Sequence, residues 1–324
     1  MKKVISVLTT IYNEPIDWVI SCVDSVYEQC ESIYDIQLIV IIDNPSIPRD
    51  YFIRLQEYCD KLQSDRFTVD VYFNQSNIGL AKSLNKAFEY AKGDFIARID
   101  TDDICLPSRF KNQFEYLINN PDVSIVGGHM IRMDANGNNI GLARNSIDSF
   151  EIRKKIKYKS VCYHPTWMMK REIFIKLDGY RPYPNSQDFD FLLRAFESNA
   201  LITNIDEYVV RYRIRSDSLS FLHSLRQRLC QEHILLMSNI RLKNDGVDNF
   251  SVESMNSYIS HNNFYRMLHS TSQKLFYFST KKLKSKNPLL IALAAVSILT
   301  SMMISPAQFR HVARLISYFL SKKF

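Results

Sequence analysis

Three aspartates stand within four positions, directly behind a short apolar run. The segment FIARIDTDD, residues 95–103, closes on Asp100, Asp102 and Asp103. Carboxylate oxygens are the ligands that hard divalent cations prefer, and Mg²⁺ or Mn²⁺ is commonly held by one or two carboxylates together with substrate phosphates. A solvated acidic turn that leads into a helix is the alternative. The spacing alone leaves both a cation site and an ordinary turn open.

Other features of the chain limit the chemistry of this segment. Arg98 stands two residues before Asp100, on the same face of the expected strand, where it can pair with the carboxylates. The chain has no GxGxxG, GxxxxGKS/T or GxSxG motif, which disfavours a Rossmann dinucleotide site, a P-loop and a nucleophile elbow. Any phosphate bound here would therefore be neutralised by a metal ion. The six cysteines form no CxxC pair and indicate reduced thiols in a cytosolic chain.

The elements that must position these residues alternate between strand and helix. Strands are expected at 4–11, 36–43, 67–73, 95–99 and 123–131, and helices at 15–29, 49–62, 79–91 and 107–118. This alternation predicts an α/β fold with a mostly parallel central sheet flanked by helices. Ligands of such sheets bind beyond the carboxyl ends of the strands. Polar residues follow four of these strands: Thr10, Tyr12 and Asn13; Asp43 and Asn44; Asn74 to Gly79; and Asp100 to Asp103.

The regular alternation of strand and helix ends after residue 128. Asn136-Gly137 predicts the tip of a hairpin within 134–141. Earlier in the chain, Pro107 suits the first turn of the helix expected at 107–118. Further helices are expected at 147–157, 171–177 and 186–199, and two strand-like runs, 200–203 and 207–214, close this part.

Five segments, taken in order, resemble the family 2 glycosyltransferases, which are inverting enzymes of the GT-A fold. They are VLTTIYNE (7–14), IIDN (41–44), NIGLAKSLNKAFEYAKGDFIARIDTDD (77–103), HPTWMMKREIFIKLDGY (164–180) and QDFDFLLRA (187–195). The resemblance covers roughly residues 3–220 and is to the bacterial surface-polysaccharide type, which serves O-antigen, capsule or exopolysaccharide synthesis. It implies a GT-A catalytic domain over residues 1–220.

The resemblance also implies a nucleotide-sugar site at the strand ends. Thr10 and Tyr12 would line the base pocket, Asp43 would accept the uracil N–H, and Asn77 would contact the nucleotide. Asp100, held by Arg98, would lie near the ribose. Asp102 would bind Mn²⁺ or Mg²⁺ that bridges the diphosphate and assists departure of the nucleotide. Where the family usually has two adjacent aspartates, this chain has Asp43-Asn44, so only Asp43 is carried over.

Inversion requires a base that deprotonates the attacking hydroxyl. The resemblance implies that this base is Asp188, with the departure that Gln187 stands where the family usually has Glu. Asp190 would point elsewhere on the helix, His164 would be structural, and Asp103 would charge or cap the start of the next helix. Arg213 and Arg215 either close over the donor phosphates or form a solvated basic face, and both interpretations stay open.

The last hundred residues differ in charge from the rest. Residues 221–324 carry 14 Lys/Arg against 4 Asp/Glu, a net of +10, and they read as a helical, apolar extension. The stretch 289–305 has no charge but is short for a membrane span, and both its flanks are basic. We expect it to lie in the plane of an anionic membrane surface. A span and a helical subdomain packed on the catalytic core are the alternatives; no recognised module supports nucleic-acid binding.

Together these features predict a hexosyltransferase that moves a sugar from a UDP-sugar to a hydroxyl of a lipid-linked saccharide, with inversion, in surface polysaccharide biosynthesis. It would be cytoplasmic and peripheral on the cytoplasmic face of the inner membrane. The alternative is a non-catalytic nucleotide- or saccharide-binding protein that keeps the GT-A fold, which Gln187 favours.

Overall fold

The computed structural model describes residues 2–158, 160–215, 224–283, 285 and 287–321. The chain forms two compact units, Met1–Ser218 and Leu219–Phe324, divided close to the boundary at 220 that was expected for the catalytic domain. The roles expected for the two parts remain predictions. The first unit is built on one mixed sheet, and the described part of the second unit is helical.

The sheet has the strand order β3-β2-β1-β4-β8-β6-β9-β5, with β7 beside β6. Its strands are β1 (Lys3–Ile11), β2 (Tyr34–Ile42), β3 (Phe67–Phe73), β4 (Phe95–Arg98), β5 (Ile104–Cys105), β6 (Val123–Met133), β7 (Asn139–Ala143), β8 (Met168–Lys170) and β9 (Leu201–Arg213). Strands β1, β2, β3, β4, β6 and β9 run one way, and β5, β7 and β8 run the other. The predicted α/β fold with a mostly parallel sheet is confirmed.

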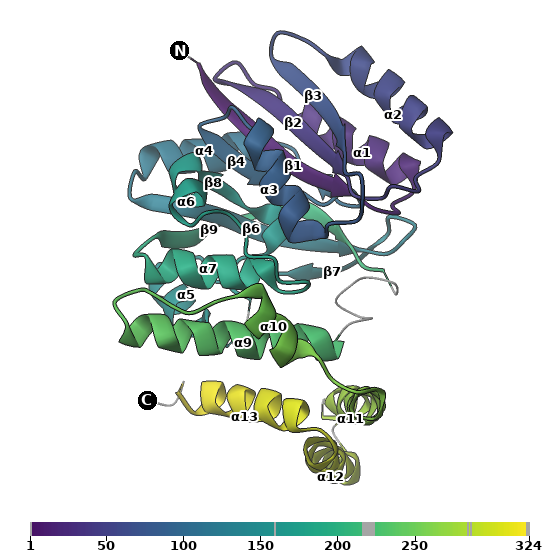
Figure 1. The fold of residues 1–324 in the computed structure, drawn as a ribbon, viewed down its shortest axis with the longest axis vertical. Coiled ribbons are helices and arrows are strands. Elements are labelled where there is room, and N and C mark those ends of the chain that lie inside the picture. The colour runs from purple at the N-terminus through teal and green to yellow at the C-terminus, as the bar shows by residue number, and fades with distance from the viewer. Residues whose placement is uncertain (1, 159, 216–223, 284, 286, 322–324) are drawn as a thin grey trace. The chain divides into compact units, whose positions relative to one another are not determined.

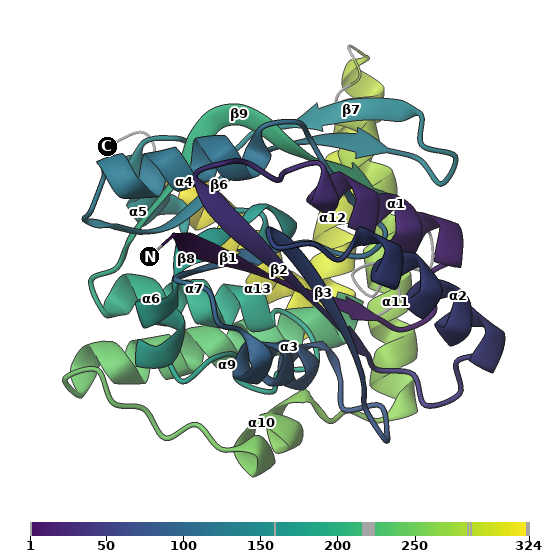
Figure 2. The ribbon, with the colours of Figure 1, turned by 90° about the horizontal axis from the view of Figure 1, so that it is seen from above.

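The order of the first four strands places the helices on both faces. From β1 the chain steps outward through α1 (Ile16–Tyr27) to β2 and through α2 (Arg49–Leu62) to β3, then returns through α3 (Leu80–Tyr90) to β4 on the other side of β1. Because such crossovers are right-handed, α1 and α2 cover one face and α3 the opposite face (Figures 1 and 2). The direction reverses between β1 and β4, and ligands of such sheets bind at this kind of switch point.

The core explains why the first strands read as continuous apolar runs. Val7 and Leu38 on one face, and Leu8 and Ile39 on the other, are almost completely buried, because both faces of β1 and β2 are covered. The remaining helices of this unit are α4 (Arg109–Asn119), α5 (Ser149–Lys155), α6 (Arg171–Lys176) and α7 (Gln187–Glu197), with a 3₁₀ turn, η1, at His164–Thr166. The hairpin predicted around Asn136-Gly137 is confirmed as the pair β6 and β7.

Three local expectations were wrong. Pro107 lies before α4, which begins at Arg109, and the short strand β5 was not expected. The runs at 200–203 and 207–214 form one strand, β9. Asn204, which looked like part of a break, stays in the strand because its side chain donates to the backbone carbonyls of Ser146 and Val161.

The second unit contains α9 (Ser224–Lys243), α10 (Val252–Ile259), α11 (Asn263–Lys282), α12 (Pro288–Ile304) and α13 (Pro306–Ser321), which confirms the predicted helical extension (Figure 1). Pro288 begins α12 and the Asn287 side chain caps it. Within the described residues, none of the helices is both long enough and apolar enough to cross a membrane.

Candidate active site

The loops that follow β1, β2, β3 and β4 are joined by hydrogen bonds at one edge of the sheet. Thr101 Oγ1 donates to the Thr10 carbonyl over 2.9 Å, and Asn44 Nδ2 donates to the Tyr12 carbonyl over 2.8 Å. Asn74 Nδ2 donates to Asp43 Oδ1 over 2.8 Å. The edge predicted to gather the polar residues therefore does gather them, because parallel strands end on the same side.

Asp43 is buried and holds the turn that precedes α3. Its Oδ1 accepts from Asn74 Nδ2 and from the Ile78 N–H over 2.9 Å, and its Oδ2 accepts from the Gly79 N–H over 2.8 Å. Among the described residues, Oδ2 accepts from one donor, and it has room for a second. The expected contact with a uracil N–H is compatible with this geometry and remains a prediction.

The other residues expected to bind the nucleotide lie around this turn. Tyr12 is half exposed, its N–H donates to Glu14 Oε2, and Thr10 is partly buried beside it. Asn77 is exposed, and its Oδ1 accepts from the Gly79 N–H over 3.1 Å. Gly79 has a φ of 83°, a conformation that favours glycine. Two of these side chains, Tyr12 and Asn77, are thus open to solvent at the switch point.

Arg98 holds Asp100 at the end of β4. The Arg98 side chain is almost fully buried, donates to the Leu8 carbonyl over 3.2 Å, and forms an ion pair with Asp100, as expected. A buried guanidinium requires such partners. Asp100 is about one-third exposed, so its carboxylate is fixed from inside the protein while part of it faces solvent.

Asp102 lies in a small group of charges that includes Glu14. Arg215 Nη1 lies 3.4 Å from Asp102 Oδ2 and 3.5 Å from Glu14 Oε1. Burial, together with the negative charges of Asp100 and Glu14, raises the pKa of Asp102 to about 7, although Arg215 opposes this. Sequence reasoning did not assign Glu14 a role, although it stands within the YNE motif at a strand end.

The donor set at Asp102 is chemically suited to a divalent cation. Oxygen ligands with repelling negative charges are stabilised by a cation such as Mn²⁺ or Mg²⁺. Within residues that the structure describes, three or more His, Cys, Asp or Glu side chains are nowhere grouped to hold a metal ion. A metal at Asp102 would therefore take further ligands from a bound diphosphate, which is common for Mg²⁺.

Asp103 has a different role from the one expected. It is fully buried, six positions before α4 begins, and accepts from the Arg213 backbone N–H over 2.8 Å. Burial and the charges of Asp102 and Asp100 raise its pKa well above the ordinary value. The expectation that Asp103 starts or caps the following helix was wrong, because the carboxylate is turned toward β9.

Arg213 fits neither interpretation left open for it. Its guanidinium donates to the carbonyls of Asp102 and Ala135, both over 2.9 Å, and lies 4.4 Å from the ring centroid of Trp18. It is buried, so it is a brace between β9, the hairpin and the loop after β4. Arg215 also packs over Trp18, but unlike Arg213 its guanidinium lies beside the carboxylates of Asp102 and Glu14. The sequence held no signal for Trp18.

Asp188 lies in the first turn of α7. Burial raises its pKa above the ordinary value, and the charge of Asp100 adds to this, so the two carboxylates lie near one another. Gln187 is buried. Asp190 points away from Asp188, as expected; it is buried and pairs with Arg194 over 2.7 Å. Of the two carboxylates in this turn, Asp188 is the one that is partly exposed.

Two tyrosines missed by sequence reasoning surround these carboxylates. Tyr180 Oη lies 2.9 Å from His164 Nε2, and burial, followed by the charge of Arg98, lowers the His164 pKa well below its ordinary value. His164 is therefore neutral, buried and structural in this setting, consistent with the expectation for it. Tyr212 is partly buried, and its pKa is raised by burial and then by the charges of Asp103, Asp100, Asp102 and Asp188.

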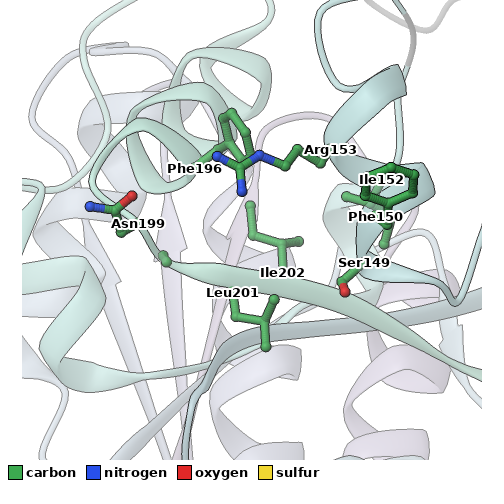
Figure 3. Close-up of a pocket in the computed structure, with 9 residues that line it drawn as sticks. Ser149, Phe150, Ile152, Arg153, Phe196, Asn199, Leu201 and Ile202 are labelled. Carbon is green, nitrogen blue, oxygen red and sulfur yellow. The ribbon is translucent and has the colours of Figure 1, made fainter.

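A hollow elsewhere in the unit does not belong to this edge. It has a volume of about 240 Å³ and is lined by Phe150, Arg153, Phe196 and Leu201, among others (Figure 3). These residues come from α5, the C-terminal end of α7 and the start of β9, whereas Asp188 is at the N-terminal end of α7. Eleven helical residues separate the two ends by about 16 Å.

The mixed sheet of this unit, with helices on both faces, is a GT-A-like fold, which is the fold of one class of glycosyltransferases. The family model described as glycosyl transferase family 2 matches residues 6–178, and the chain belongs to this family. An uncharacterized glycosyltransferase of Methanocaldococcus jannaschii, MJ1057, is 32% identical over 214 residues, which are 66% of this chain and 71% of that protein. The protein is a glycosyltransferase.

Two further similarities support this assignment. The O-antigen biosynthesis glycosyltransferase WbnJ of Escherichia coli is 33% identical over 141 residues, which are 43% of this chain and 55% of WbnJ. The crystal structure of S. aureus TarS 1–349 in complex with UDP-GlcNAc has a TM-score of 0.58 at 15% identity and covers 98% of this chain and 89% of that chain. Similarity at this low identity shows the fold.

Proposed function

We propose that the protein transfers a sugar from a UDP-sugar to a hydroxyl of a saccharide acceptor, with inversion at the anomeric carbon. The observation that carries the proposal is that the charge of Asp100, after burial, raises the pKa of both Asp102 and Asp188, so carboxylates from two elements far apart in sequence lie near one another at one sheet edge. Asp102 is proposed to bind the metal ion that accompanies the diphosphate, and Asp188 is proposed to accept the proton of the acceptor hydroxyl. An inverting transfer needs a base for the acceptor proton, and a metal ion assists departure of the diphosphate.

In the proposed reaction, Asp188 accepts the proton of the acceptor hydroxyl as its oxygen bonds to the anomeric carbon. The bond between that carbon and the diphosphate oxygen breaks, and the electron pair leaves with UDP. Bound Mn²⁺ or Mg²⁺ would supply Lewis-acid stabilisation of the leaving diphosphate. Burial supports the base, because it raises the pKa of Asp188 toward the range in which a carboxylate accepts protons well.

The donor half of the site would be formed by the loops after β1, β2 and β4. Thr10, Tyr12 and Asn77 would surround the base, and Asp43 Oδ2 would accept its N–H. Asp100, fixed by Arg98, would contact the ribose. The bound ligand of TarS, UDP-GlcNAc, supports a UDP-sugar as the class of donor tested first.

The acceptor is proposed to be a lipid-linked saccharide of surface polysaccharide synthesis, in line with the O-antigen role in the name of WbnJ. The surface of α12 supports an encounter with lipid. Its large apolar side chains Leu289, Leu293, Val296, Leu299 and Met303, here called the α12 stripe, are exposed. Small residues such as Ala294 and Ser301 are buried, and Ser301 accepts at its carbonyl from Ser272 of α11. We propose that this stripe lies on the cytoplasmic face of the inner membrane.

The test is transfer from radiolabelled UDP-sugars to synthetic lipid-diphosphate saccharides in the presence of Mn²⁺. Asp188→Asn and Asp102→Asn should each lower kcat by at least about 100-fold. Asp17→Asn is the matched control, because Asp17 is exposed on α1, and it should retain full activity. Full activity of both site variants would refute the assignment.

The second candidate is a binding protein that keeps the fold without turnover, and Gln187 is the observation that favours it. Calorimetry separates the two functions. UDP binding that depends on Mn²⁺, with no transfer or donor hydrolysis on any acceptor, would favour the binding protein. Gln187→Glu would then be expected to create no activity, because Gln187 is buried beside the base.

A further inference from the structure

The helical unit contains a cluster of positive charges built from three helices. Its members are Arg228 and Glu232 of α9, His269 of α11, and Gln308, Arg310 and Arg314 of α13; we call them the Arg228 cluster. They lie outside the first unit, and Arg310 and Arg314 belong to the basic flank that follows the uncharged stretch 289–305.

The pairing within the cluster is incomplete. Arg310 Nε donates to Glu232 Oε2 over 2.8 Å, and Tyr258 Oη donates to the same oxygen over 3.4 Å. Arg228 donates to Gln308 Oε1. Within the described residues, Arg314 forms no ion pair. Glu232 is thus the one carboxylate that faces three guanidinium groups.

Within the described part of this unit, no other side-chain carboxylate supplies the missing charge. Asp248 is paired with Arg241, and the remaining two, Asp245 and Glu253, are exposed at other positions. Burial, followed by the charge of Arg314, lowers the pKa of Arg228 to about 10. Partly buried positive charges without counter-ions cost stability, so a bound anion would stabilise this arrangement.

Two buried nitrogens in the cluster also lack hydrogen-bond partners. His269 Nδ1 lies 2.8 Å from Ser305 Oγ, which also accepts from the Gln308 N–H. Neither His269 Nε2 nor the amide donor Gln308 Nε2 has a hydrogen-bond partner in the described part of the chain. Both side chains are at least 99% buried. Unpaired buried donors in a native fold call for an acceptor.

We propose that Arg228, Arg310 and Arg314, together with the amide of Gln308, form a binding site for a phosphate or diphosphate group. Guanidinium groups bind phosphate oxygens in pairs, and several converging forks suit a multiply charged tetrahedral anion better than a carboxylate. Arg310 is about half exposed, which leaves the cluster open to solvent. The site lies in the helical unit, so the inference stands independently of the proposed transfer reaction.

The ligand can be a free diphosphate or the phosphate of a lipid head group, and two probes distinguish these sources. The first is calorimetry of the full chain with inorganic pyrophosphate in EDTA, which prevents metal-dependent binding at Asp102. The second is sedimentation with vesicles of phosphatidylglycerol, compared with vesicles of phosphatidylcholine. Neither probe contains a sugar donor, so failure here leaves the proposed transfer reaction untouched.

Two variants of the cluster and one control carry the test. Arg314→Gln removes a guanidinium that has no ion-pair partner among the described residues, so the melting temperature should stay equal or rise. Binding of whichever probe the wild-type protein binds, pyrophosphate or phosphatidylglycerol vesicles, should weaken by about tenfold or more. Gln308→Glu places a resident carboxylate beside Arg228 and should both raise the melting temperature and abolish binding. Arg266→Gln removes the same charge at an exposed position of α11 and should change nothing.

Each outcome decides the proposal. Loss of pyrophosphate binding in the two cluster variants supports a site for free diphosphate. Loss of phosphatidylglycerol binding alone supports a lipid phosphate. The proposal is overturned if wild-type protein binds neither probe, if both cluster variants bind as the wild type does, or if Arg266→Gln weakens binding equally.

Discussion

The backbone N–H of Arg213 donates to the buried carboxylate of Asp103 over 2.8 Å, while the Arg213 guanidinium donates to the Asp102 carbonyl over 2.9 Å. Two residues 110 positions apart therefore hold the end of β9 against the loop that carries Asp102. This brace gives the predicted metal ligand a fixed backbone, which a loop after a four-residue strand would otherwise lack.

Asp103→Ala should therefore lower both stability and activity. The variant leaves the Arg213 N–H buried without an acceptor, which costs about 1–3 kcal/mol of the free energy of unfolding. Displacement of the loop should also weaken metal-dependent transfer. Asp103→Asn, whose amide oxygen can still accept the N–H, should retain most of the stability in urea titrations. Equal losses in the two variants would contradict the brace.

The pH dependence of transfer should follow Asp188. A base must be deprotonated, and burial with the neighbouring charge of Asp100 raises its pKa, so activity should fall with decreasing pH at a higher pH than an ordinary aspartate would give. Asp100→Asn removes the neighbouring charge and should move the acidic limb of kcat/KM to lower pH. A limb that does not move would show that Asp188 titrates independently of Asp100.

The stability of the helical unit should fall in mild acid because of His269. Burial, and then the charge of Arg228, lowers the pKa of His269 from 6.5 to about 4. Between these values the unfolded chain binds a proton that the folded chain excludes, so stability is complete above the unfolded pKa and is lost as pH falls toward about 4. The slope from this group is at most about 1.4 kcal/mol per pH unit.

His269→Asn keeps an acceptor for Ser305 but cannot titrate, so its free energy of unfolding should depend less steeply on pH between 6.5 and 4. Glu232, whose pKa burial raises, contributes with the opposite sign in both proteins and cancels in the comparison. Circular dichroism of urea unfolding at several pH values measures the difference. Identical slopes would contradict the prediction.

The α12 stripe should contribute most of the affinity for lipid. Replacing Leu293, Val296 and Met303 with Asn removes apolar area that is exposed in the protein and should weaken vesicle binding by at least about tenfold. The matched control is Thr300→Asn, an exposed position on the same helix that should bind as the wild type does. Unchanged sedimentation of the triple variant would show that lipid is not the partner of this surface.

Much of the fold, and the edge at which the polar strand ends meet, were accessible from residue order. The apolar runs of β1, β2 and β3, each followed by polar residues, predict parallel strands whose ends meet at one edge. Arg98 pairs with Asp100 as expected, since residues two apart on a strand share a face. Asp190 points away from Asp188, as helical spacing predicted, and the helical character of the last hundred residues was also predicted correctly.

The residues that sequence reasoning placed wrongly are those that act through distant partners. Arg213 was expected on a phosphate or in solvent, and Asp103 at a helix start, yet they contact each other. Glu14, Trp18 and Tyr212 received no role, because nothing near them in the chain shows what lies beside them.

The sequence by itself determined the family of this protein, the alternation of its elements and the edge at which its carboxylates meet, because local periodicity and strand direction are properties of neighbouring residues. Only the tertiary structure decided which charged groups are braces and which face a substrate. It also brought the arginines of α9 and α13 around a single glutamate. Burial and pairing depend on residues a hundred positions away, and no local pattern records them.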